Sequence, residues 1–277
     1  MISNEDARDF YQSLDTPGVY GAFPLSLQVF RGILPSQLKG IHPGGCNRHF
    51  EVFRELQIIP EYCFGCYKVH IEPRNVIELF KLFMLLEELD LRNDNTRKCM
   101  VENRPGYSGA YKGFIYCRGL KEGQEVCDIV SNAVADKISQ DISVKLKRGC
   151  SEFNDAYPGF SSAQDDGDLM EYNKNWRILE ENFDKGRTYP PPRSGNTNHK
   201  LGSTYPAWEE FAMTYWLGYA ATIGDNSYLE IAEHKLAPVP GVKRPPFSGP
   251  QLLSKRTIMG TGRQGAHPPP SATSRQL

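Results

Sequence analysis

The sequence contains no uninterrupted apolar run of the roughly 18 residues that a helix needs to cross a bilayer. Its most hydrophobic stretch, residues 76–91, is interrupted by four acidic residues and one lysine. The first residues are acidic and polar, so they resemble neither a secretory signal nor an arginine-rich transit peptide. We therefore expect an intracellular, cytoplasmic protein that is not inserted in a membrane.

Cysteine is sparse, with seven cysteines in 277 residues. Without a signal peptide a disulfide framework is not expected, so each cysteine is a core residue, a metal ligand or a reactive thiol. Cys99, Cys117 and Cys127 fall on the apolar sides of predicted strands and of a predicted helix. Because free cysteine packs as a small apolar side chain, we interpret these three as core residues.

Acidic residues are missing from residues 235–277, which carry seven cations. The whole chain has a formal net charge of −1, which leaves −8 for residues 1–234. This basic tail is rich in proline and glycine and is not expected to fold alone. We expect it to engage RNA or an acidic protein partner. Its candidate contact residues are Lys243, Arg244, Lys255 and Arg256.

The central part of the chain changes its hydrophobic period several times. Alternating apolar residues predict strands, and three- to four-residue spacing predicts helices. The order is strand, helix, strand, strand, helix, strand, over residues 67–72, 76–89, 97–104, 111–118, 120–138 and 142–150. This order predicts an α+β, ferredoxin-like core with a four-stranded antiparallel sheet and two helices on one face.

The alternation of side chains agrees across all four predicted strands. One face of the sheet is apolar on every strand, and we expect the two helices to cover it. The other face is mostly charged, with Lys68, His70, Glu72, Lys98, Glu102, Lys145 and Lys147, and it also carries Phe114 and Tyr116. The fold prediction depends on this agreement.

Four segments make up the predicted domain organisation. Residues 1–62 form a helical N-terminal extension, and residues 63–150 form the ferredoxin-like core. Residues 151–234 are rich in aromatic residues and are expected to pack on the core as a helical extension, with a clear amphipathic helix that starts at Pro206. The basic tail, residues 235–277, comes last.

A cysteine cluster is expected at one edge of the sheet. In a ferredoxin-like order the first and last strands are neighbours, so Cys66 and Cys150 come together. The candidate ligands of a structural zinc, or of another thiolate-bound metal, are Cys46, His49, Cys63, Cys66 and Cys150. There is no second CxxC pair, and the alternation nominally points Cys66 and Cys150 to opposite faces. Buried inert thiols and a thiol-redox pair are the alternatives.

The charged face offers a second candidate site. His70 and Glu72 lie two residues apart on one strand and point the same way. A histidine of near-neutral pKa oriented by a carboxylate is suited to acid–base chemistry, with Lys68 and Lys145 holding an anionic substrate. The alternative is a solvated face of interleaved charges, as on many open antiparallel sheets.

Strand 111–118 carries a third candidate site. Its segment KGFIY, Lys112 to Tyr116, resembles the RNP1 block of RNA-recognition motifs, which is K/R-G-F/Y-G/A-F in the same strand. The resemblance covers residues 66–148 and implies that Phe114 and Tyr116 stack on RNA bases, with Lys112 and Lys147 nearby. The alternative is that aromatic residues of the C-terminal extension, such as Trp176 or Trp208, cover both rings.

Two functions are compatible with these candidates. The preferred function is a binding or assembly module that engages RNA or an acidic protein. The alternative is an enzyme that acts on a small anionic substrate at the charged face. A deep pocket that contains His70 and Glu72 would favour the enzyme, whereas a face covered by aromatic side chains would favour the module.

Overall fold

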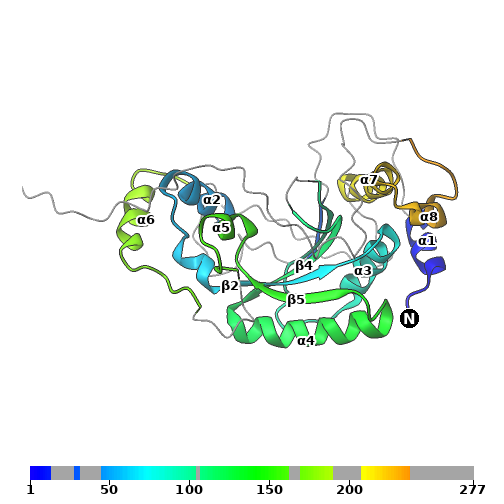
Figure 1. The fold of residues 1–277 in the computed structure, drawn as a ribbon, viewed down its shortest axis with the longest axis horizontal. Coiled ribbons are helices and arrows are strands. Elements are labelled where there is room, and N and C mark those ends of the chain that lie inside the picture. Colours follow the sequence, from blue (N-terminus) through cyan, green and yellow to red (C-terminus); the bar gives the residue numbers. More distant parts are fainter. Residues whose placement is uncertain (14–27, 32–44, 104–106, 162–168, 190–206, 238–277) are drawn as a thin grey trace, which may run out of the picture. The chain divides into compact units, whose positions relative to one another are not determined.

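A computed structural model describes residues 1–13, 28–31, 45–103, 107–161, 169–189 and 207–237 (Figure 1). The candidate RNA contacts of the basic tail lie outside these residues. Within them the protein is α+β, with an antiparallel sheet and several helices. None of the described helices has both the length and the apolar composition that a membrane span requires.

The described sheet has five strands in the order β1-β3-β4-β2-β5, and every neighbouring pair is antiparallel. The predicted strands appear as β2 (Cys66–Glu72), β3 (Arg97–Val101), β4 (Tyr111–Arg118) and β5 (Ser143–Arg148). As predicted, the first and last of these strands, β2 and β5, are neighbours. Strand β1 (Gln28–Arg31), which pairs with β3, was not predicted because four residues are too few to show a period.

Two long helices cover one face of the sheet. Helix α3 (Val76–Glu88) begins after Asn75, whose side chain accepts a hydrogen bond from the Glu78 backbone N–H, and α4 (Gly119–Lys137) lies along β2, β4 and β5 (Figure 1). Helix α3 is apolar around most of its circumference because it is covered twice. The sheet covers one side, and α7 (Ala207–Ile223) covers another, where Trp216 meets Phe80 at a ring distance of 5.5 Å.

The strand register confirms the predicted division into two faces. Val69 of β2 pairs with Ile115 of β4 and with Leu146 of β5, and all three side chains are buried. The preceding residue, Lys68, pairs with Tyr116 and Lys147 on the opposite face. Side chains of directly paired residues lie on the same side of a sheet, so both faces can be assigned from this register.

The two extensions form smaller helices around the sheet. Before β2 lie α1 (Asn4–Ser13), α2 (Gly45–Leu56) and the 3₁₀-helix η2 (Glu61–Gly65). After β5 lie α5 (Ser151–Ala156), α6 (Trp176–Asp184), the 3₁₀-helix η3 (Asn226–Tyr228) and α8 (Leu229–Ala232). Helix α5 opens the C-terminal extension directly after β5. It forms where Phe153 becomes fully buried between Ile59 and Phe160.

Candidate functional site

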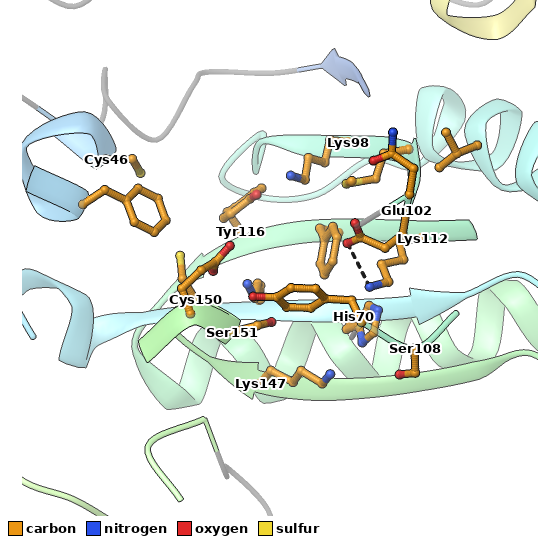
Figure 2. A pocket seen from close by; sticks show the side chains of 18 of the residues that line it. Cys46, His70, Lys98, Glu102, Ser108, Lys112, Tyr116, Lys147, Cys150 and Ser151 are labelled. Carbon is orange, nitrogen blue, oxygen red and sulfur yellow. Dashed lines mark hydrogen bonds and ion pairs between the residues drawn. The ribbon is translucent and has the colours of Figure 1, made fainter. Parts of the chain in front are cut away.

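A cavity of about 630 Å³ lies over the charged face of the sheet, opposite α3 and α4 (Figure 2). Strands β2 to β5 form its floor. Its walls come from α2, from the start of α5, from the loop before β4 and from α7. The wall residues are Cys46, Asn47, Phe50, Asn103, Tyr107, Ser108, Cys150, Ser151, Glu152 and Tyr215. The face is therefore the floor of a pocket and not an open solvated surface.

Lysines dominate the charged groups of this cavity. Four lysines line it, Lys68, Lys98, Lys112 and Lys147, against two glutamates, Glu102 and Glu152. The Lys112 ammonium pairs with the Glu102 carboxylate at 3.2 Å. Lys68 is only 8% exposed and pairs with no carboxylate of the described residues. It also sits directly across from Lys147. The cavity floor therefore holds an excess of positive charge.

The Phe114 ring is surrounded by groups of its own protein. The imidazole of His70 stacks on it with ring centroids 4.8 Å apart and an interplanar angle of 10°. The ammonium groups of Lys68 and Lys98 each lie 5.2 Å from its centroid. These contacts are cation–π and stacking interactions. Phe114 thus already has three intramolecular partners where the RNP1 resemblance implies stacking on a base.

Of the two tryptophans considered as covers, Trp176 does not lie over this face. Trp176 packs against Tyr157, Tyr172 and Phe64, away from the cavity lining. The side chain of Trp208 lies outside the described residues. Tyr116 lines the cavity with its ring partly buried.

His70 is a neutral, buried histidine. Its side chain is 3% exposed, and neither ring nitrogen has a hydrogen-bond partner among the described residues. Burial lowers the pKa of His70 to about 2, and the neighbouring cations Lys147, Lys112, Lys68 and Lys145 act in the same direction. His70 therefore differs from the near-neutral base that the sequence suggested, because burial and lysines outweigh its carboxylate neighbour.

The other two residues of the predicted acid–base site lie at the margin of the cavity. The Glu72 carboxylate is 3.6 Å from His70 Nδ1, too long for a good hydrogen bond, and Glu72 is not part of the lining. Lys145 is exposed and is not part of the lining either. Burial lowers the pKa of Lys147. Glu72 raises this pKa, and the neighbouring lysines lower it further.

The cysteine edge is assembled in part. The Gly149 backbone N–H donates to the Cys66 carbonyl at 2.8 Å, so the ends of β2 and β5 meet as expected. Burial raises the pKa of Cys66 to about 12, with Cys150 and Cys46 adding to the rise. Cys46 is exposed at the surface, yet desolvation by the surrounding chain raises the pKa of its thiol to about 11, again with a contribution from Cys150. The thiols of Cys46, Cys66 and Cys150 are close enough to influence one another, and those of Cys46 and Cys66 are protonated at neutral pH.

Cys63 and His49 have structural surroundings of their own. Cys63 is buried in a small cluster with Ile59, Phe153 and Phe160, and the His49 ring stacks on Tyr62 at 5.3 Å. In the described part of the chain, no three His, Cys, Asp or Glu residues are grouped so that they could hold a metal ion. The structural zinc therefore stays a prediction. As predicted, Cys99 and Cys117 are core residues, and Cys127 is partly buried against the same core.

Sequence reasoning missed several lining residues. Lys98 had been placed on the correct face but was not included among the site residues. Phe50, in the N-terminal extension, is 37% exposed and lines the cavity. Ser108 and Ser151 come from segments that looked like turns and loops. Of these residues only Lys98 could have been found from the sequence, because the alternation along β3 places it on the cavity face.

Comparisons with protein-family models, with curated proteins and with solved structures found no match to this chain. Any function must therefore be inferred from the geometry of the cavity.

Proposed function

We propose that the cavity over the sheet binds a small anionic ligand. The observation that carries this proposal is the combination of Lys68, buried without a carboxylate partner, and His70, buried without a hydrogen-bond partner, on one cavity floor. Buried polar groups are nearly always hydrogen-bonded, so each exception calls for an explanation. An anion with hydrogen-bonding oxygens would satisfy both groups.

The arrangement of charge across the strands supports the same proposal. Lys68 and Lys147 are direct cross-strand partners, and like charges in this position destabilise a sheet. The burial of Lys68 strengthens the repulsion because there is less water to screen it. A bound anion between the strands would turn this repulsion into attraction. Features that lower stability without an evident structural gain are typical of functional sites.

Binding is better supported than acid–base catalysis. A histidine with a pKa of about 2 is neutral at pH 7 and holds a proton poorly. In the proposed site, neutral His70 orients the ligand through hydrogen bonds, and the lysines supply the charge. A bound anion would raise the pKa of His70, since it would offset the effect of the four lysines.

We also propose that the core is a ferredoxin-like unit. The order β5-β2-β4-β3, with α3 and α4 on one face, supports this description, and β1 extends it by one strand. The resemblance to RNA-recognition motifs remains part of this proposal. A role for the basic tail in binding RNA or an acidic protein is a separate proposal.

The anion site can be tested by titrating the full chain with inorganic phosphate, pyrophosphate and citrate in a calorimeter. Lys68→Met keeps the length of the side chain and removes its charge, so we expect at least about a tenfold loss of affinity, or about 1.4 kcal/mol. Lys121→Met is the matched control, because Lys121 is an exposed residue of α4 outside the cavity. We expect it to bind like the wild type.

Thermal unfolding separates a binding role from a structural one. Without ligand, Lys68→Met should unfold at the same temperature as the wild type or higher, since it removes a buried charge that has no carboxylate partner among the described residues. A lower melting temperature would make Lys68 a structural residue. Failure of all three anions to bind, or equal binding by Lys68→Met, would overturn the proposal.

A further inference from the structure

The two ends of the cavity differ in chemistry, and this difference bears on the class of ligand. Figure 2 shows Glu102, Lys112 and Ser108 toward one end, near His70, and Cys46 and Cys150 toward the other. The first end offers charges and hydrogen bonds. The second offers thiols and aromatic rings. A ligand class can be inferred from this difference only if the proposed anion site is correct.

The polar end needs a ligand with both acceptors and a donor. The lysines can only donate hydrogen bonds, and they suit the oxygens of an anion. Neutral His70, however, presents one nitrogen that donates and one that accepts. A simple carboxylate or sulfate has no donor for that second nitrogen. An anion that also carries a hydroxyl group can donate to the accepting nitrogen while its charged oxygens accept from the lysines.

The other end presents aromatic surface to the cavity. Phe50 lies one turn after Cys46 on the same side of α2, and both residues line the cavity. Phe50 is 37% exposed, one of the few large apolar side chains in the described residues that are exposed. Tyr116 lines the same region from β4. Two aromatic side chains that line the same cavity offer apolar surface to a flat group.

The size of the cavity agrees with a ligand that spans both ends. A volume of about 630 Å³ lies in the range of sites that enclose small molecules and cofactors. A lone phosphate, or a sugar phosphate at the polar end, would leave the ring surface of Phe50 uncovered. A ligand that has an anion, hydroxyl groups and a flat ring in sequence fits the whole cavity.

We infer that the ligand is a mononucleotide. Its phosphate and ribose hydroxyls lie beside His70 and the ammonium groups of Lys68 and Lys98, which gather around Phe114. Its base packs on Phe50 and Tyr116, and Tyr116 is the cross-strand partner of Lys68. Base stacking on an aromatic side chain contributes strongly to affinity, whatever the base. The base therefore supplies affinity that a ribose phosphate lacks.

The test is a calorimetric titration of the full chain with three classes of probe. These are inorganic phosphate, ribose 5-phosphate and the four ribonucleoside 5′-monophosphates. We expect at least one nucleotide to bind about tenfold or more tightly than ribose 5-phosphate. Phe50→Ala should remove that difference and leave the affinity for ribose 5-phosphate unchanged. Phe50→Trp, which keeps an aromatic face, should preserve it. Lys68→Met should weaken all three classes.

The possible outcomes separate this inference from the proposed function. If phosphate and ribose 5-phosphate bind through Lys68 but no nucleotide binds more tightly, the anion site stands and the nucleotide inference is wrong. The same holds if nucleotides bind more tightly but Phe50→Ala and Phe50→Trp both leave the difference intact. If no probe binds, both the anion site and the nucleotide inference are wrong. Melting curves of the Phe50 variants test whether a loss of affinity is caused by a loss of folded protein.

Discussion

His70 shows how strongly a single side chain depends on its surroundings. The residue pairs with Phe114 on one side of β2 and with Lys145 on the other, and its ring lies flat against the ring of Phe114. Burial removes the water that would stabilise the imidazolium, and the lysines repel it. The protonated form is therefore much less stable in the folded protein than in the unfolded chain, whose histidine has a pKa near 6.5.

The stability of the ligand-free protein should depend on pH through His70. Below pH 6.5 the unfolded chain binds a proton at this residue, and the folded protein does not do so until about pH 2. The free energy of unfolding should therefore fall with decreasing pH, by about 1.4 kcal/mol per pH unit between about pH 6 and pH 3 from this residue. His70→Phe should remove this part of the slope in urea unfolding.

The control for this experiment is His234→Gln. His234 is exposed, so its replacement should leave the slope of the wild type in place. An unchanged slope in His70→Phe would show that the imidazole is hydrated or protonated in the folded protein.

Gly113 has a packing role that the RNP1 resemblance does not require. It lies on the apolar face of β4, and a Cβ atom there would come within 2.5 Å of Leu82 Cδ2 from α3. Gly113→Ala should therefore lower the free energy of unfolding by about 1–3 kcal/mol, measured in urea.

Gly65→Ala is the matched substitution. Gly65 ends η2 without a positive φ, and a Cβ atom there would meet nothing within 4 Å. We expect a change within about 0.5 kcal/mol. If Gly113→Ala is as stable as Gly65→Ala, α3 is packed less closely on β4 than the Leu82 contact implies.

At the scale of elements, α2 and α6 are joined by a buried charge network. Arg48 of α2 is 3% exposed and donates hydrogen bonds to Glu180 and Asp184 of α6, the second at 2.8 Å. The pKa of Arg48 is raised, because the two carboxylates outweigh its burial. Helix α2 also carries Cys46 and Phe50, so this network helps to position one wall of the cavity.

Removal of the Arg48 charge should be costly. Arg48→Met leaves two carboxylates partly buried without their cation, and we expect a loss of about 3–5 kcal/mol in the free energy of unfolding. Arg177→Met is the control, since its pair with Glu61 is about half exposed on both sides. We expect its melting temperature to stay close to that of the wild type. Equal destabilisation by the two variants would contradict a special role for the buried network.

For the whole molecule, the outstanding property is the separation of charge along the chain. Residues 1–234 have a net charge of −8, yet the floor of the cavity that they form is rich in lysine. The local charge around His70 is therefore opposite in sign to the net charge of this part of the chain. An acidic protein with a basic pocket concentrates small anions at one place and repels them elsewhere. The basic tail is a second, separate source of positive charge.

The tail should contribute to binding of a long polyanion and not to the cavity. We expect a chain that ends at His234 to bind single-stranded poly(U) more weakly than the full chain, with a smaller slope of affinity against salt, because fewer counterions are released. Its melting temperature and its affinity for phosphate should match those of the full chain. Identical affinities and slopes would remove the tail from any RNA-binding role.

Local patterns were sufficient for most of the fold. The alternation around Val69, Ile115 and Leu146 predicts a covered face on each strand, and the three- to four-residue period of α3 and α4 predicts helices. The approach of Cys66 to the end of β5 was also predictable from the strand order. In contrast, β1 and α5 are short, and they depend on neighbours distant in the sequence. Their residues carried no sufficient local signal.

The sequence by itself determined which side chains share a face, because alternation along a strand is a property of the backbone. It did not determine what lies over that face. The pattern of Lys68 and His70 was also compatible with a solvated face, yet α2, α5 and α7 form walls around them. Burial lowers the pKa of His70. Lys68 is buried without a carboxylate partner among the described residues, and the walls make the face into the floor of a pocket. These properties depend on distances between segments far apart in the chain, which only the tertiary structure decides.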